Sequence, residues 1–206
     1  TSKAVVFHAR DPPADRDLWP ELFVATLGAD DPNGRQLNGM GGGISSLSKI
    51  CVVGPPSRDD ADIDYSFFQL TPRNASVDIS GNCGNMSSAM GPFALDEGLV
   101  QAEGGKTEVR IHNTNTRKII RARFNADEGM AAVDGPFTLP GVGGLGAKVT
   151  LDFLDPGGAK TGTLTPTGNT RDVLDVPGVG QIEASMIDAA NPCVFVRASD
   201  IGITGA

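Results

Sequence analysis

The hydrophobic positions of this chain show helical periodicity in two segments. In residues 16–27 apolar side chains recur at helical spacing, and Gly28 ends the run, which predicts an amphipathic helix. In the segment from Asn85 onward, apolar side chains cover most of a helix circumference. They are Met86, Ala89, Met90, Phe93, Ala94 and Leu95. A helix that is apolar nearly all round is buried in the protein core.

Short apolar segments separated by glycine and proline turns make up most of the remaining chain, and they predict strands. These segments are residues 3–8, 49–53, 64–70, 75–79, 107–116, 118–125, 147–153 and 181–188. One buried helix among many strands predicts an α+β lobe, in which a curled and mostly antiparallel sheet surrounds a central buried helix.

Composition narrows the function classes without naming one. The chain has 206 residues and a net charge of -8, and this acidic balance argues against a nucleic-acid partner. No apolar run approaches the roughly 20 residues of a membrane span, so no membrane partner is expected. Three widely spaced cysteines form neither a disulfide framework nor a zinc site, which favours a reducing, cytoplasmic compartment. We expect Cys51 and Cys193 to be core residues.

Two glycine-rich segments imitate nucleotide-binding motifs. Residues 141–146 read GVGGLG, but Pro140 precedes them and a strand-like segment follows, so we predict a hairpin loop. Residues 41–49 lack the glycine that a phosphate-binding loop places before its lysine. No nucleotide cofactor is therefore expected.

The strongest candidate for a functional site is the segment SGNCGNM, residues 80–86, which connects a predicted strand to the buried helix. The first backbone N–H groups of a helix lack intrahelical acceptors and suit a carboxylate. Asn82, Gly84, Asn85 and Met86 are candidate substrate-binding residues for this reason. Cys83 lies in the same field, which favours a thiolate. A glycine-rich turn with a small buried cysteine is the alternative interpretation.

Residues 45–49, SSLSK, provide the second candidate. Strand alternation places Lys49 and Cys51 on one face of the strand and Ile50 and Val52 on the other. A partly buried lysine is a usable base, and Ser48 lies beside it. The alternative is an edge-strand lysine that prevents aggregation.

The third candidate is the start of the chain, where Ser2 adds a hydrogen-bond donor and Lys3 a positive charge. A solvated terminus is the alternative interpretation. His8 and His112 stand outside any metal-like cluster, so no metal site is proposed.

Taken together, these segments resemble the PrpF family of 2-methylaconitate cis-trans isomerases, methylitaconate isomerases and 4-oxalomesaconate tautomerases. The resemblance rests on the segments TSKAVVF, GRQLNGMGGGISSLSKICVV, DYSFFQ, SGNCGNMSSAMGPFALDEGLV, HNTNT, LTPTGN and NPCVFVRASDIGITG. It implies a fold similar to diaminopimelate epimerase and proline racemase, with two pseudo-symmetric lobes and the active site between them.

The resemblance also implies roles and boundaries. Lys49 takes the position of the family's catalytic lysine, Ser2 that of a serine near the substrate, and Cys83 that of a cysteine used as an acid/base in related epimerases. Residues 1–188 would form the N-terminal lobe, and residues 189–206 would open a second lobe. An echo of residues 2–11 in residues 191–200 agrees with this division, and we interpret both chain ends as cut.

The function expected from this resemblance is a cofactor-free movement of a proton within a small unsaturated di- or tricarboxylate. A cysteine-based racemase or epimerase and a non-catalytic carboxylate-binding lobe stay open as alternatives. The expected partners are the polycarboxylate substrate and the second lobe, and a homodimer is compatible with the sequence.

Overall fold

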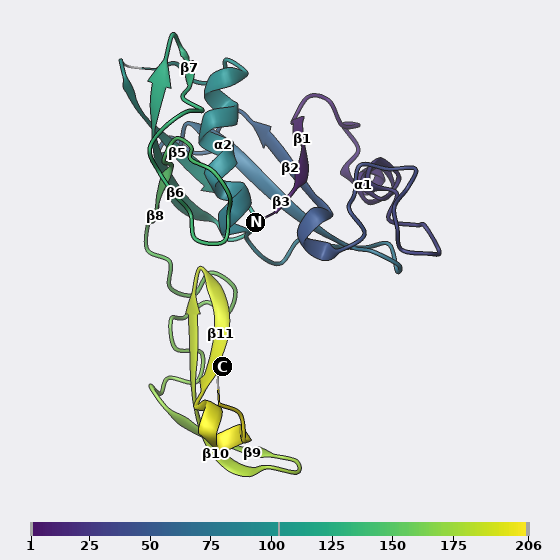
Figure 1. Ribbon diagram of the computed structural model, residues 1–206, viewed down its shortest axis with the longest axis vertical. Helices are drawn as coiled ribbons and strands as arrows, with labels where there is room; N and C mark the ends of the chain where they lie inside the picture. Colours follow the sequence, from purple (N-terminus) through teal and green to yellow (C-terminus); the bar gives the residue numbers. More distant parts are fainter. Residues whose placement is uncertain (1, 103, 205–206) are drawn as a thin grey trace. The chain divides into compact units, whose positions relative to one another are not determined.

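The computed structural model describes residues 2–102 and 104–204. The chain divides into two compact units, Thr1–Leu154 and Asp155–Ala206. Figure 1 shows the strands and helices of each unit. Among the described residues, no helix is both long and apolar enough to cross a membrane.

An eight-stranded sheet forms the framework of the first unit, in the order β1-β2-β3-β5-β6-β7, with β4 paired to β3 and β8 paired to β6. The strands are β1 (Ala4–His8), β2 (Lys49–Gly54), β3 (Ile63–Thr71), β4 (Ser76–Asp78), β5 (Lys106–Asn113), β6 (Lys118–Asp127), β7 (Met130–Ala131) and β8 (Thr150–Phe153). Among the described strands, only the β1–β2 and β3–β5 pairs are parallel, so the sheet is mostly antiparallel, as predicted.

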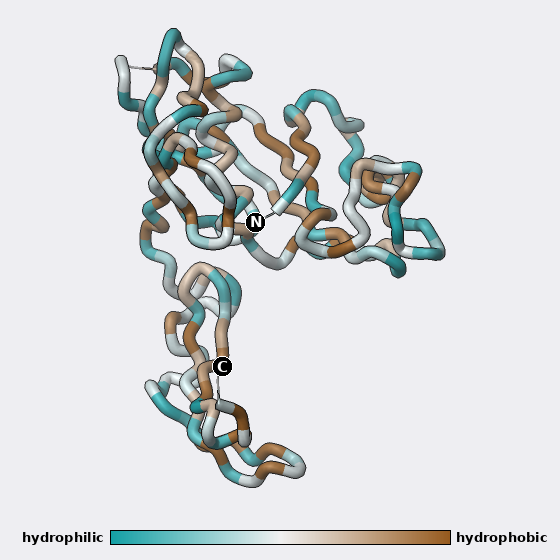
Figure 2. The backbone as a smooth tube through the Cα atoms, in the orientation of Figure 1, coloured by the Kyte–Doolittle hydropathy of each residue, from teal (hydrophilic) through white to brown (hydrophobic). Residues whose placement is uncertain are grey.

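The two helices pack on opposite faces of this sheet. Helix α2 (Gly84–Asp96) is the predicted buried helix, and it packs in a core cluster with strands β2, β3, β5 and β6. Helix α1 (Trp19–Leu27) covers the other face, in a cluster with β1 and β2. A 3-10 turn at Arg16–Leu18 forms the first part of the segment predicted as helix, because Pro20 suits the first turn of an α-helix. Figure 2 shows the apolar stretches of α1 and the central strands.

Strand β2 lies between the two cores. Cys51 and Val53 belong to the α2 core, whereas Ile50 and Val52 belong to the α1 core. The alternation predicted from the sequence is therefore confirmed, and it places Lys49 on the face of the sheet that α2 covers.

The second unit contains a three-stranded antiparallel sheet in the order β11-β10-β9. Its strands are β9 (Asp172–Val176), β10 (Gly180–Ala189) and β11 (Asn191–Val196). All six residues of β11 are exposed, and they include Cys193. The prediction that Cys193 is a core residue is wrong, because no described element covers β11. Cys51 is buried, as expected.

The boundary between lobes that we expect after residue 188 stays a prediction, since it concerns a second lobe. The echo segments agree in one respect: residues 2–11 contain β1 and residues 191–200 contain β11.

Candidate active site

The start of helix α2 has the open geometry expected of an anion site. Cys83 is the N-cap residue with an extended backbone, and its side chain makes no capping hydrogen bond. The first helical N–H groups, of Gly84 and the residues that follow it, therefore have no acceptor from the cap. A Cβ atom placed on Gly81 or Gly84 would meet nothing within 4 Å. The fold leaves open space beside both glycines, and a ligand could use it.

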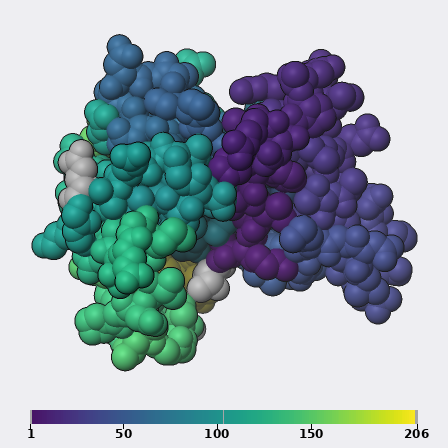
Figure 3. Space-filling view, turned by 90° about the horizontal axis from the view of Figure 1, so that it is seen from above, coloured from purple at the N-terminus to yellow at the C-terminus, as the bar shows by residue number. Residues whose placement is uncertain are grey.

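Ser2 joins this helix start from the beginning of the chain. Its Oγ lies 3.7 Å from Cys83 Sγ and accepts a 3.4 Å hydrogen bond from Asn85 Nδ2. Figure 3 shows the N-terminal segment, in purple, beside the teal surface to which α2 belongs. The structure thus brings together three residues that lie up to 83 positions apart in the sequence.

Lys49 begins strand β2 on the same face of the sheet. Its side chain is buried, with only 7% of the residue exposed. The ammonium donates a hydrogen bond to Gln69 Oε1 and lies 5.4 Å from the ring centroid of Phe67. Among the described residues, no carboxylate pairs with it. An amine held by one neutral acceptor and an aromatic ring is unlike a solvated surface lysine.

Cys51 lies on the same face of β2 as Lys49 and belongs to the core cluster against which Cys83 packs. Burial raises the pKa of its thiol to about 12, and Tyr65 and the Lys49 ammonium oppose this rise while Cys83 adds to it. Burial also raises the pKa of Tyr65, and Cys51 and Cys83 both contribute to this increase. Cys51 and Tyr65 are therefore neutral floor residues of the core cluster against which Cys83 packs, and they supply no charge of their own.

The other predicted residues are placed less directly. Ser48 is buried, and its Oγ lies 2.8 Å from both Gln36 Oε1 and the Ile44 carbonyl oxygen, so its hydroxyl holds the preceding loop. Lys3 Nζ donates to the Gly41 carbonyl at 3.5 Å rather than joining Ser2 and Cys83. The side chain of Met86 is part of the α2 core, which leaves its backbone N–H as the group available at the helix start.

Asn82 has a structural task in the turn. Its Oδ1 accepts hydrogen bonds from the Cys83 N–H at 2.8 Å, from Ser87 Oγ at 3.0 Å and from Asn113 Nδ2 at 3.2 Å. Only its Nδ2 group stays available for a ligand.

A cavity of about 520 Å³ adjoins the helix start. Gly84, Asn85 and Ser88 line one side of the 520 Å³ cavity, and residues 137–147 line the other. The bridge Phe137↔Gly146 closes that second segment into a hairpin loop, which confirms the interpretation of GVGGLG. No local pattern indicates that this loop lies beside Gly84.

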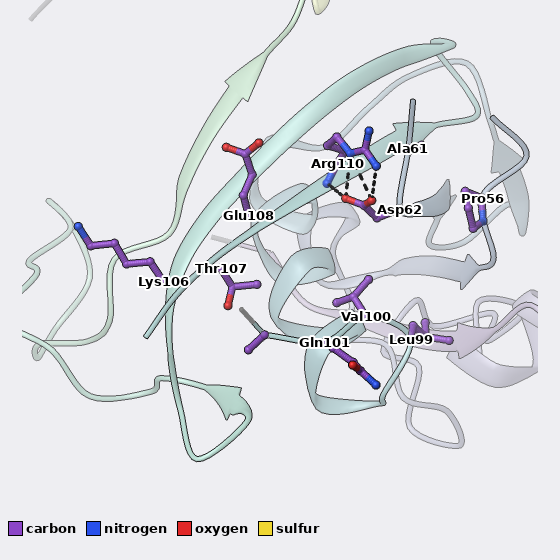
Figure 4. A pocket seen from close by; sticks show the side chains of 11 residues that line it. Pro56, Ala61, Asp62, Leu99, Val100, Gln101, Lys106, Thr107, Glu108 and Arg110 are labelled. Carbon is purple, nitrogen blue, oxygen red and sulfur yellow. Dashed lines mark hydrogen bonds and ion pairs between the residues drawn. The ribbon is translucent and has the colours of Figure 1, made fainter. Parts of the chain in front are cut away.

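Another cavity, of about 750 Å³, contains none of the predicted site residues. Figure 4 shows its lining, in which Arg110 donates to the Asp62 carboxylate from its backbone N–H, from Nε and from Nη2. Its remaining walls include Leu99 and Val100, which follow the end of α2. No three of the described His, Cys, Asp and Glu residues are grouped as metal ligands, in this cavity or elsewhere.

Sequence reasoning missed Gln69 as a site residue. It lies opposite Lys49 in the β2–β3 register, and its Nε2 donates to three carbonyl oxygens, those of Ser45, Ser48 and Leu70. The signal was available, because alternation in residues 65–69 places this amide on the same face as Tyr65 and Phe67.

A comparison with protein families shows where this chain belongs. Residues 1–206 match the family described as PrpF protein. The chain belongs to the PrpF family. The resemblance stated from the sequence segments is thereby confirmed.

Two curated PrpF relatives illustrate the family. The chain is 43% identical to the 3-methylitaconate isomerase of Eubacterium barkeri over 205 residues, which is 100% of this chain and 53% of the relative. It is 40% identical to the 2-methyl-aconitate isomerase of Cupriavidus necator over 216 residues, which is 100% of this chain and 54% of the relative. The chain thus spans about half the length of these relatives.

Solved structures confirm the PrpF fold. A crystal structure of methylitaconate-delta-isomerase superimposes with a TM-score of 0.81 at 42% identity, covering 100% of this chain and 52% of that one. A probable proline racemase from Agrobacterium radiobacter K84 gives a TM-score of 0.52 at 15% identity, covering 89% of this chain and 45% of that one. At that identity the likeness concerns the fold alone. It confirms the predicted diaminopimelate epimerase-like class.

Proposed function

We propose that this chain supplies the proton-transfer half of an isomerase active site, which moves a proton within a small unsaturated di- or tricarboxylate. One observation carries the proposal: Lys49 lies on the face of β2 that α2 covers, and Cys83, the N-cap of α2, packs against the same core cluster. Ser2 contacts Cys83 and Asn85 at the helix start. The relatives named as methylitaconate and methylaconitate isomerases support the substrate class.

The chemistry assigns each group a task. A proton beside a double bond that bears a carboxylate is weakly acidic, so a base must remove it while donors hold the new negative charge. The Lys49 amine takes the proton and becomes an ammonium. The free N–H groups at the start of α2, with the Ser2 hydroxyl, hold the carboxylates.

Returning the proton completes the reaction without any change in composition. If the proton is delivered to the other end of the allylic system, two carbons from its origin, the double bond shifts. If it returns to the same carbon after rotation, cis and trans isomers exchange. Both outcomes use only a base, an acid and anion-binding donors, so the proposed mechanism requires no metal, flavin, nucleotide or pyridoxal cofactor.

The similarity of the fold to that of a proline racemase makes a racemase the competing function. A racemase would use Cys83 with a second cysteine and would leave Lys49 without a task. The two functions differ in substrate, since one acts on an unsaturated polycarboxylate and the other on the α-carbon of an amino acid.

The test is solvent deuterium incorporation by the full-length protein. It is incubated in D₂O with methylitaconate, 2-methylaconitate, aconitate, oxalomesaconate and proline, and deuterium in each acid is followed by NMR. Deuterium in at least one polycarboxylate and none in proline is the expected result. Exchange into proline alone would overturn the proposal in favour of a racemase, and exchange into none of the five would show a binding lobe instead.

A further inference from the structure

Asn113 occupies the end of strand β5 and lies beneath the turn that leads into α2. It is completely buried, with 0% of its surface exposed. Its register partner in the parallel β3–β5 pair is Tyr65, one of the floor residues of the candidate site. A buried side-chain amide has to form its hydrogen bonds within the protein, so its partners show which segments it connects.

The Asn113 amide connects two segments through its two ends. Its Nδ2 donates to Asn82 Oδ1 at 3.2 Å, and its Oδ1 accepts from the N–H and the Oγ1 of Thr116, each at 2.9 Å. The Thr116 bonds fix the amide orientation, because the oxygen must face Thr116 and the nitrogen must then face Asn82.

The Asn82 amide in turn fixes the backbone of Cys83. The same Oδ1 that accepts from Asn113 also accepts the Cys83 N–H at 2.8 Å and Ser87 Oγ at 3.0 Å. The backbone of Cys83 is therefore fixed by an oxygen whose position depends on Asn113. Ser87 lies in the first turn of α2, so the direction of the helix start depends on the same atom.

The neighbouring residues anchor Asn113 itself. The Asn115 side chain bonds both backbone groups of Phe67, accepting from its N–H at 2.7 Å and donating to its carbonyl at 2.8 Å. Thr114 Oγ1 lies 2.7 Å from Ser66 Oγ. Strand β5 was predicted to continue through residue 116, but it ends at Asn113 because residues 114–117 form the turn into β6, in which the Arg117 N–H donates to the Asn113 carbonyl at 2.8 Å.

From these contacts we infer that Asn113 is a positioning residue for Cys83. It does not touch the substrate. It sets the Asn82 amide, and through that amide the direction of the Cys83 thiol and of the N–H groups at the start of α2. The inference rests on the proposed function for its catalytic meaning, but the position of a thiol can also be measured without any turnover.

Two variants separate positioning from folding. Asn113→Asp keeps the size and the acceptor for Thr116 but loses the donor to Asn82, so the Asn82 amide must turn and release the Cys83 N–H. Asn113→Ala removes the acceptor of the Thr116 N–H and Oγ1, but Thr116 is only half-buried, so water can replace that acceptor. Asn82 Oδ1 keeps the Cys83 N–H and Ser87 Oγ as donors, so this variant should fold. Thr114→Val is the matched control, since it breaks a half-buried hydrogen bond in the same segment, on the side toward Ser66.

The direct readout is the alkylation rate of Cys83 by iodoacetamide as a function of pH. It is measured in the full-length protein with Cys193 replaced by serine, with the alkylated site identified by mass spectrometry. Asn113→Asp and Asn113→Ala should shift the pH profile of Cys83 alkylation and change its rate severalfold, whereas Thr114→Val should leave both unchanged. Profiles that match the wild type in whichever Asn113 variant folds would overturn the inference.

The second readout is turnover on the substrate found by deuterium exchange. Misplacement of a catalytic group by about 1 Å can cost on the order of 10²-fold, so kcat should fall roughly 10- to 100-fold with KM little changed. A rise in KM at constant kcat would contradict positioning of Cys83. Absence of exchange by the wild type would count against the proposed function alone, because the alkylation profiles would still decide the role of Asn113.

Discussion

Lys49 and Gln69 face each other across the β2–β3 pair, and the Lys49 ammonium donates a hydrogen bond to Gln69 Oε1. Gln69 is neutral, so it can hold both the ammonium and, after the proton has left, the free amine. This relationship separates a lysine that acts as a base from a lysine that forms a structural ion pair.

Replacing the neutral partner by a charged one tests this point. In Gln69→Glu the carboxylate stabilises the ammonium, so the pH at which the enzyme gains activity should move upward, and kcat near neutral pH should fall by about 10²-fold. The new carboxylate also faces three carbonyl oxygens, and stability should drop by about 1–3 kcal/mol. The pH dependence of kcat and a thermal melt distinguish the two effects, since lost stability alone does not move the pH profile. An unmoved profile would mean that Lys49 is not the base.

Gly84 offers a variant that should separate stability from binding. Its added Cβ would meet no atom within 4 Å, and its φ does not require glycine, so Gly84→Ala should raise the free energy of unfolding by about 0.4–1 kcal/mol. The methyl group occupies the space where a carboxylate would approach the helix N–H groups, so KM should rise by about tenfold. Gly105→Ala is the control, because it also adds a methyl into open space, at the start of β5. Equal KM values for the two variants would remove the anion site from the start of α2.

Burial of Cys51 and Tyr65 predicts a loss of stability in alkali. Burial raises the pKa of Cys51 from 9.0 to about 12 and raises that of Tyr65 as well, so both groups stay protonated in the folded state after they would ionise in the unfolded chain. The unfolded chain then binds fewer protons, and the free energy of unfolding is retained below about pH 9 and falls as pH rises toward 12. Each group contributes a slope of up to about 1.4 kcal/mol per pH unit. Urea unfolding at increasing pH measures this slope, and Cys51→Val should reduce it. Equal slopes for the variant and the wild type would refute the assignment to Cys51.

Local patterns were sufficient to predict much of the framework. Alternation placed Lys49 and Cys51 on one face of β2, and the glycine-flanked start of α2 followed from where the apolar helical run begins. Pro140 and the strand-like segment after Gly146 identified a hairpin loop. Each of these depends on residues close together in the sequence.

Long-range contacts account for what the sequence did not reveal. The Asn113 and Asn82 amides lie 31 positions apart, and no local pattern indicates that they meet. Gln69 reaches Lys49 across 20 positions through strand register. Cys193 was predicted to be a core residue, but its exposure depends on what packs on β11, and its own segment cannot specify that.

The central claim is that Lys49 moves the proton and Cys83 assists it. The most direct test is solvent deuterium exchange into the substrate under single-turnover conditions, with full-length wild type, Lys49→Ala, Lys49→Arg and Cys83→Ser. Lys49→Ala should lose about 10²–10⁴-fold in the exchange rate, and Lys49→Arg should not restore it, because arginine stays charged. Cys83→Ser should be milder if lysine alone transfers the proton and equally severe if the two residues act as a pair. Exchange at the wild-type rate in Lys49→Ala, together with none in Cys83→Ser, would contradict the account and establish a cysteine-based mechanism.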